Sequence, residues 1–217
     1  MRIAVFFFCA LASLAVFGQS AAPSGNTPTT SSVETVRYRI DPSQSKFMVV
    51  APRGGLLWFK GHSHYIAVRD FEGDAEVTLN AVTPASLQMA VRAASLEETG
   101  ADFTPEQKGI IKKELEEIVL ETAKYPEIHF KSTAVQGKLN NGALEVEITG
   151  DLTLHGVTRR IEIPATVTVS GDTFHAVGKF AIDRKKFNVK ATNAFHGLVR
   201  VKHGMKFTFD IIGRRVA

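Results

Sequence analysis

ALEVEITGDLTLHGVTRRIEIP, residues 143–164, is the stretch that decides the fold class. Its first half alternates apolar and polar side chains over about a dozen positions, which predicts a β-strand with one buried face. The apolar positions of this half are Leu144, Val146, Ile148, Leu152 and Leu154. Gly150 lies inside the run and predicts a bend or a bulge, because it offers no side chain for packing.

The second half of the stretch predicts the other arm of a hairpin. Gly156 supplies the turn after His155, and alternation then continues from Ile161 to Val169. Pro164 interrupts this arm and indicates an edge, a bulge or a strand start, because proline has no N–H to give to a ladder. A hairpin this long needs further strands to cover its apolar face.

Other alternating runs along the chain predict those strands. They are Thr35–Ile40, Lys46–Ala51, Phe71–Leu79, Leu87–Val91, Ile128–Val135, Phe174–Ile182 and Val199–Gly213. With the two arms of the hairpin they make about eight or nine antiparallel strands, whose apolar faces must be buried together in a sandwich or a barrel. We expect an all-β chain that forms an antiparallel barrel of about eight strands, and the interior of such a barrel is either just filled or holds one small ligand.

One segment has helical periodicity instead. Thr104 fits an N-cap, Pro105 fits the first helical position, and Gln107 completes a capping box. The predicted helix runs to about Thr122, before Tyr125-Pro126 ends it. Its apolar side consists of Ile111, Leu115, Ile118 and Val119. We therefore expect one amphipathic α-helix, packed on the outside of the sheet or across its mouth.

The N-terminal residues have the pattern of an export leader. Residues 1–20 predict a secretory signal peptide, because Arg2 precedes an apolar run that is short for a spanning helix. An uncleaved anchor is the alternative interpretation. Residues 21–34 are rich in Ser, Thr, Pro and Gly and predict a disordered tether, which leaves residues 35–215 as the folded domain. Cys9 lies in the leader, so the mature chain has neither a disulfide nor a cysteine nucleophile.

Composition excludes several kinds of partner and chemistry. The formal net charge of +4 becomes +3 once Arg2 is removed, and this mild, scattered charge does not indicate nucleic-acid binding. No later apolar run is long enough to span a bilayer after signal cleavage. The chain has no nucleophile elbow, phosphate loop or His-Glu-x-x-His motif, so we expect neither enzyme activity nor a cofactor.

Several segments, in order, resemble a known family. Leu152–Arg159, LTLHGVTR, resembles the signature of the YceI-like family of secreted bacterial proteins. Supporting segments are Tyr38–Asp41 with Ser45 and Phe47, Phe71–Gly73, Tyr125–Phe130 with Ser132 and Thr133, Phe180–Phe187, and Val201–Phe209. The resemblance covers roughly residues 36–215. It implies a lipocalin-like barrel with one helix and an apolar cavity, which in some members holds isoprenoid lipids.

Residues of one parity on different strands form the candidate ligand-binding set. They are Phe47, Val49, Val77, Met89, Val146, Phe174, Phe180, Phe207 and Phe209. If the strands close into a barrel, these side chains point together, either into a packed core or onto a cavity wall. The pattern alone favours a packed core, whereas the resemblance favours a hollow interior.

Polar residues are weaker candidates for ligand or metal binding. His155 and Arg159 are expected at the cavity mouth, in contact with a lipid headgroup; the alternatives are that His155 fixes the hairpin and that Arg159 is solvated. His62 and His64 in Gly61-His62-Ser63-His64, similar to the Gly-His-Asp-His segment of one branch of the family, would share a face on a strand and could bind a metal. The third ligand would come from His155, His129 or Asp70; a polar loop is the alternative.

The resulting hypothesis is a periplasmic or secreted carrier that holds one apolar molecule of isoprenoid or quinone type. Either the helix 105–122 or the loop 184–198 could act as a lid. The rival hypotheses are a metal-dependent enzyme or metal carrier that uses His62 and His64, and a stress or interaction module with a filled core. The sequence leaves the oligomeric state open, a homodimer included.

Overall fold

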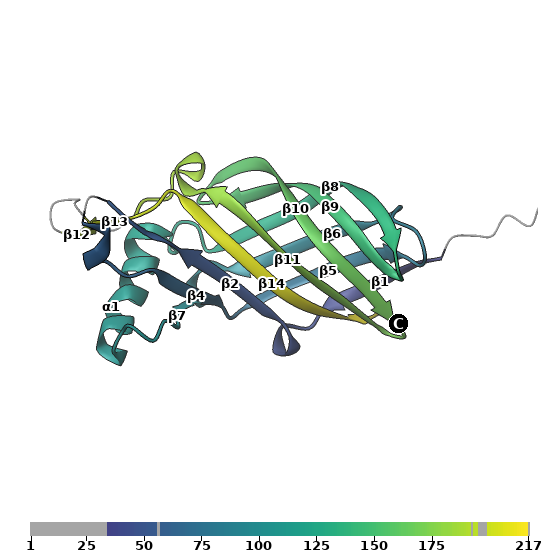
Figure 1. Cartoon of the computed structure of the whole chain (residues 1–217), viewed down its shortest axis with the longest axis horizontal. Coiled ribbons are helices and arrows are strands. Elements are labelled where there is room, and N and C mark those ends of the chain that lie inside the picture. The colour runs from purple at the N-terminus through teal and green to yellow at the C-terminus, as the bar shows by residue number, and fades with distance from the viewer. Residues whose placement is uncertain (1–33, 56, 192, 195–198, 217) are drawn as a thin grey trace, which may run out of the picture. The chain divides into compact units, whose positions relative to one another are not determined.

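The computed structural model describes residues 34–216 with gaps at 56, 192 and 195–198 (Figure 1). The expected signal peptide (1–20) and the tether (21–34) lie outside the described residues, apart from Glu34. The strands are β1 (Thr35–Ile40), β2 (Lys46–Ala51), β3 (Arg53–Gly54), β4 (His64–Val68), β5 (Phe71–Thr78), β6 (Ser86–Arg92), β7 (Leu96–Glu98), β8 (Glu127–Asn140), β9 (Ala143–Leu154), β10 (Val157–Ser170), β11 (Thr173–Asp183), β12 (Asn193–Ala194), β13 (Val199–Val201) and β14 (Gly204–Arg215). Helix α1 spans Pro105–Glu114.

The strands close into one antiparallel barrel. Its main sheet has the order β1-β5-β6-β8-β9-β10-β11-β14, and β14 also pairs with β1, which closes the ring. β2, β4 and β7 pair in the order β14-β2-β4-β7 and continue β1, β5 and β6 beyond short breaks. Counting each continued strand once, the wall has 8 strands, so the predicted barrel with one helix is confirmed.

Tight turns connect the longest strands. Asn141-Gly142 joins β8 to β9, and His155-Gly156 joins β9 to β10. All four residues have positive φ, between 49° and 80°, as a type I′ turn requires. This turn twists in the same sense as the strands it joins, which allows long, uninterrupted ladders on both sides.

The hairpin of β9 and β10 accommodates two irregular residues, Gly150 and Pro164. The β8–β9 register shifts between Ser132 and Ala134, opposite Gly150, so the predicted irregularity at this glycine is a bulge on the neighbouring strand. Pro164 lies inside β10 and pairs with Glu147 of β9. The ladder between β10 and β11 begins only at Ala165. The N–H group that Pro164 lacks therefore interrupts no hydrogen bond on the β11 side, and the strand continues through the proline.

Aromatic rings lie over glycines of neighbouring strands. Gly178 pairs with Phe209, and Gly213 pairs with Phe174. A Cβ added at either glycine would come within 3.0 Å of the partner ring, closer than side chains tolerate. The Phe174 ring in turn meets Tyr38 edge-on at 5.3 Å between centroids, and Tyr38 is fully buried at 0% exposure. Burial raises the pKa of the Tyr38 hydroxyl.

Helix α1 begins as predicted but ends differently. Gln107 N donates to Thr104 Oγ1 at 3.3 Å, and Thr104 N donates to Gln107 Oε1 at 2.9 Å, which together form the capping box. After α1 the chain widens into a π-helical turn over Leu115–Val119. This wider turn rotates the residues that follow, so Ile118, predicted on the apolar side, is 45% exposed. The helical segment ends at Val119 with Leu120 as its C-cap, three residues before the predicted end at about Thr122, and Glu121 then has a left-handed φ of 48°.

Asp41 holds the break between β1 and β2. Its Oδ1 accepts from Ser43 N at 3.1 Å, and its Oδ2 accepts from Arg214 Nε on β14 at 3.0 Å. The hydrogen bonds from Ser43, followed by the one from Arg214, lower the pKa of the Asp41 carboxyl. One ionised side chain therefore ties the turn to the strand that closes the barrel.

We predict that Gly213→Ala destabilises the protein by about 1–3 kcal/mol, because the new methyl group displaces the Phe174 ring from a packed wall. Urea unfolding at equilibrium measures the change. Gly109→Ala in α1 is the matched control: nothing lies within 4 Å of its added Cβ, so it should be neutral or stabilising by up to about 1 kcal/mol. Equal effects of the two substitutions would contradict the packing argument.

We also predict that Asp41 contributes to acid sensitivity. A lowered folded-state pKa stabilises the fold above the usual value of 3.8, and this stabilisation is lost as pH falls through the folded-state pKa. Asp41→Asn should therefore have a lower Tm than the wild type near neutral pH, and the gap should shrink as pH falls below 3.8. Thermal unfolding from pH 7 downward tests this, and a gap that stays constant with pH would refute it.

Candidate functional site

The barrel encloses a cavity of about 290 Å³. Its wall draws side chains from every strand of the main ring and from the segment that contains α1, and nearly all of them are apolar. An apolar cavity about half this size already excludes water and admits a small apolar guest. The interior is therefore a space for an apolar molecule rather than a completely packed core.

All nine residues of the predicted interior set lie on this wall. The Phe180 and Phe207 rings stack at 4.7 Å between centroids with an interplanar angle of 10°. Phe47 lies 6.2 Å from Phe207, and Phe209 lies 6.4 Å from Phe180, so the rings form a band across β2, β14 and β11. That these residues bind a ligand remains a prediction.

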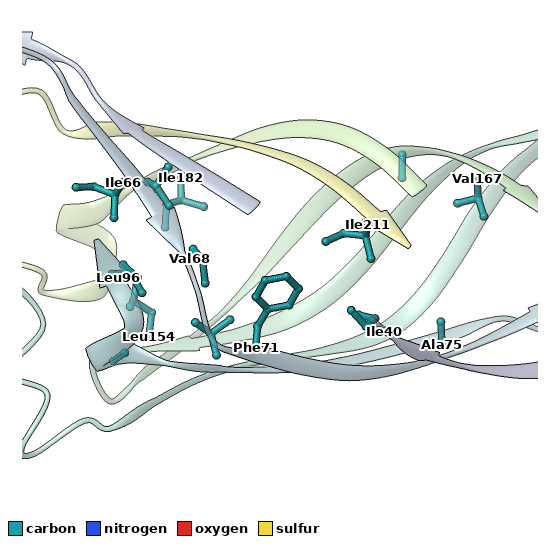
Figure 2. Packing of buried hydrophobic residues seen from close by; sticks show 14 of the residues in the cluster. Ile40, Ile66, Val68, Phe71, Ala75, Leu96, Leu154, Val167, Ile182 and Ile211 are labelled. Atoms are coloured by element: carbon teal, nitrogen blue, oxygen red, sulfur yellow. The ribbon is translucent and has the colours of Figure 1, made fainter. Parts of the chain in front are cut away.

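Residues from facing walls point toward the same interior space. Figure 2 shows Phe71 of β5 and Ile211 of β14 projecting inward from different strands, and both are buried. Phe71 meets Phe47 edge-on at 6.1 Å between centroids. The aromatic band therefore continues onto the β5 side of the interior.

One end of the barrel carries α1, β12 and β13 (Figure 1). Both segments predicted as lids reach the cavity there: Ile111, Leu115 and Val119 come from the helical segment, and Val189 and Lys190 come from the loop after β11. We call this end the mouth.

His155 does not lie on the cavity wall. Its Nε2 is 2.6 Å from Glu121 Oε2, and its ring centroid is 4.3 Å from that of Tyr125. The His155 ring, with a smaller effect of the Lys190 charge, holds the pKa of the Glu121 carboxyl below its usual range. The turn at His155 thus contacts the end of the helical segment, which neither the headgroup role nor the hairpin-fixing alternative predicted.

Arg159 is also absent from the cavity wall. Its Nε donates to the carbonyl of Lys186, in the segment that follows β11. The side chain is exposed. Neither of the two residues expected at the headgroup position is therefore on the wall.

His62 and His64 do not act as a pair. β4 begins at His64, so His62 lies before the strand and the alternation that would align the two side chains does not apply. His62 Nδ1 is 3.3 Å from Asp102 Oδ2, whereas His64 Nδ1 is 2.8 Å from Glu98 Oε2. The Phe103 ring contacts both imidazoles, at 5.5 and 5.1 Å between centroids.

The residues proposed as a third metal ligand have other neighbours. His129 Nε2 is 3.1 Å from Glu127 Oε2, and Asp70 Oδ2 is 2.7 Å from Arg92 Nε. Across residues 34–216, outside the gaps, no group of three or more His, Cys, Asp or Glu side chains could hold a metal ion.

Sequence reasoning missed two residues at the mouth. The Glu98 side chain is fully buried, at 0% exposure, and it could have been found because it shares the parity of Leu96. Arg184 lies on the cavity wall with Nη1 donating to Val189 O at 2.8 Å, and burial lowers the pKa of its guanidinium. Arg184 follows a strand end, where alternation gives no direction, so no sequence signal identified it.

Comparisons with known proteins agree with this architecture. Curated relatives match over short stretches: a UPF0312 protein of Pseudomonas savastanoi pv. phaseolicola is 52% identical over 52 residues, 24% of this chain and 26% of that protein. Protein YceI of Escherichia coli O157:H7 is 40% identical over 79 residues, 33% of this chain and 38% of that protein. The matched part thus spans between about a quarter and two fifths of these relatives.

Solved structures match over most of the chain. BcnA of Burkholderia cenocepacia aligns with a TM-score of 0.62 at 21% identity, covering 80% of this chain and 98% of that one. A polyisoprenoid binding domain from Saccharophagus degradans, implicated in plant cell wall breakdown, aligns with a TM-score of 0.58 at 14% identity, covering 83% of this chain and 99% of that one. At such identities the likeness concerns the fold.

Among the described residues, no helix has the length and apolar character needed to cross a membrane. The profile of the YceI-like domain matches residues 38–212, most of the chain and the whole barrel wall except its two ends. The chain therefore belongs to the YceI-like domain family.

Proposed function

We propose that this protein is a carrier that holds one apolar, isoprenoid-like lipid inside its barrel. The observation that carries the proposal is the cavity of about 290 Å³ with its almost entirely apolar wall. Each methylene moved from water into such a space contributes about 0.8 kcal/mol, so a long tail binds without many polar contacts. The relative described as a polyisoprenoid binding domain supports this class of ligand.

In this proposal the protein binds and does no chemistry. The few polar side chains on the cavity wall include no cysteine, and the serine among them, Ser86, donates to the Glu76 carboxylate at 3.0 Å in an exposed pair with no histidine beside it. The rival metal function receives little support, because His62 and His64 face different acids. The rival filled-core module is disfavoured by the cavity itself. The leader-like residues 1–20 support export, and we place the mature carrier in the periplasm.

The helical segment is proposed as the lid. β7 is the last strand of its sheet branch, and α1 packs beside it. Lys112 Nζ donates to the carbonyls of Ala94 and of Leu96, the latter at 3.1 Å, and pairs with Glu116 at 3.0 Å. One lysine therefore covers the strand edge and fastens the helix, and its release would free this side of the mouth.

We predict that Ala176→Trp reduces uptake of an apolar probe more than tenfold, because Ala176 is on the cavity wall and the indole fills the space. Fluorescence titration with a prenyl probe, and mass spectrometry of solvent extracts of the purified protein, measure the loss. Ala181→Trp on the same strand is the control, because Ala181 is exposed and absent from the wall. Absence of any lipid or probe in wild-type protein would refute the carrier proposal.

We predict that Lys112→Met speeds release of a bound probe about two- to tenfold, the range that corresponds to one net hydrogen bond. Stopped-flow displacement measures the rate. Lys113→Met is the control, because Lys113 is 71% exposed and its ion pair is with Glu117 of its own helical segment, at 4.0 Å. Equal release rates in both variants and the wild type would rule out α1 as the lid.

A further inference from the structure

His64 is one of the few polar residues on a mostly apolar cavity wall. The polar wall residues are His64, Glu76, Ser86, Glu114, His129, Arg184 and Lys190. The side chains of His129 and Lys190 are 52% and 65% exposed, whereas that of His64 is 25% exposed. His64 is therefore the imidazole that a guest inside the cavity can meet away from water.

The buried Glu98 carboxylate orients this imidazole. Glu98 Oε1 accepts from Tyr65 N at 3.1 Å and from Gly100 N at 2.7 Å, while Oε2 lies 2.8 Å from His64 Nδ1. With Glu98 Oε2 as the acceptor of this hydrogen bond, His64 Nδ1 is the donor and carries the ring proton. The Phe103 ring stacks on the imidazole at 5.1 Å with an interplanar angle of 7°, which sets the plane of the ring.

The opposite edge of the ring is the one available to a ligand. Nδ1 points toward Glu98, and Glu98 is not part of the cavity wall although His64 is. Within the described part of the chain, His64 Nε2 has no hydrogen-bond or ion-pair partner. In a neutral imidazole with the proton on Nδ1, Nε2 is a hydrogen-bond acceptor.

We infer that His64 Nε2 receives the hydroxyl of the bound lipid, so that the ligand class is a long-chain alcohol with an apolar tail. The inference rests on the proposed carrier function and adds the position and chemistry of the head. An uncharged head fits this place, because the buried Glu98 carboxylate next to His64 repels an anion. A hydroxyl donates to Nε2, whereas a carbonyl group has no proton to donate.

The test compares two ligands with the same tail. We propose to measure displacement of a fluorescent apolar probe by 1-dodecanol and by dodecane, in the wild type, His64→Leu and His62→Leu. In His64→Leu the ratio of alcohol affinity to hydrocarbon affinity should fall about five- to tenfold, while dodecane affinity is retained. In His62→Leu, whose imidazole lies off the wall beside Asp102, the ratio should stay at the wild-type value.

A second variant reverses the hydrogen-bond direction. Glu98→Gln can donate from its amide to His64 Nδ1, which moves the ring proton to Nε2. A methyl ketone such as 2-tridecanone should then gain several-fold over dodecane, with no such gain in the wild type. A role of His64 in packing alone would leave this preference unchanged, and this measurement decides the matter if His64→Leu does not fold.

The outcomes separate the two proposals. If wild-type protein binds dodecane and 1-dodecanol, but the affinity ratio is the same in His64→Leu and the ketone gains nothing in Glu98→Gln, the head position at His64 is wrong and the carrier function stands. If neither compound displaces the probe from wild-type protein, the carrier function fails and the head position fails with it.

Discussion

The closure of the sheet at β14 is the constraint on which the rest of the molecule depends. This strand pairs with β11 along one edge and with β1 and β2 along the other. Closing a sheet pairs the backbone hydrogen-bonding groups of its two edge strands, and every second side chain then points inward. With eight strands around the ring, the circumference is set by hydrogen bonding and not by how much side-chain volume the interior contains. A cavity can therefore persist without leaving backbone N–H and C=O groups of the wall unpaired.

The side chains keep that space open by lying along the wall. Phe180 stacks flat on Phe207, and the Phe209 and Phe174 rings lie over glycines of the paired strand. Each ring is thus supported by its neighbours within the sheet and does not need a partner from across the barrel. The interior is apolar and ordered at once, as a site that binds by excluding water requires.

Three carboxylates that lie off the cavity wall fix the geometry of the segments around it. Asp41 ties the β1–β2 break to Arg214, Glu121 joins the helix end to the turn at His155, and Glu98 orients His64 at the mouth. In each case a carboxylate contacts a cation or an imidazole from a segment distant in sequence. Such contacts define how the helical segment and the barrel meet, while the wall around the cavity is almost entirely apolar.

The sequence by itself determined most of the barrel strands, though not β4 and β7, together with the turn at Gly156, the capping box at Thr104 and the inward parity of the nine wall residues. These features are local: side-chain direction alternates along any strand, and a cap depends on a few adjacent residues. Only the tertiary structure decided that His155 and Arg159 lie off the wall, that Ile118 is exposed, and that His62 and His64 diverge. It also decided that a cavity remains, because this depends on how rings from strands far apart in sequence share one volume, which no local pattern encodes.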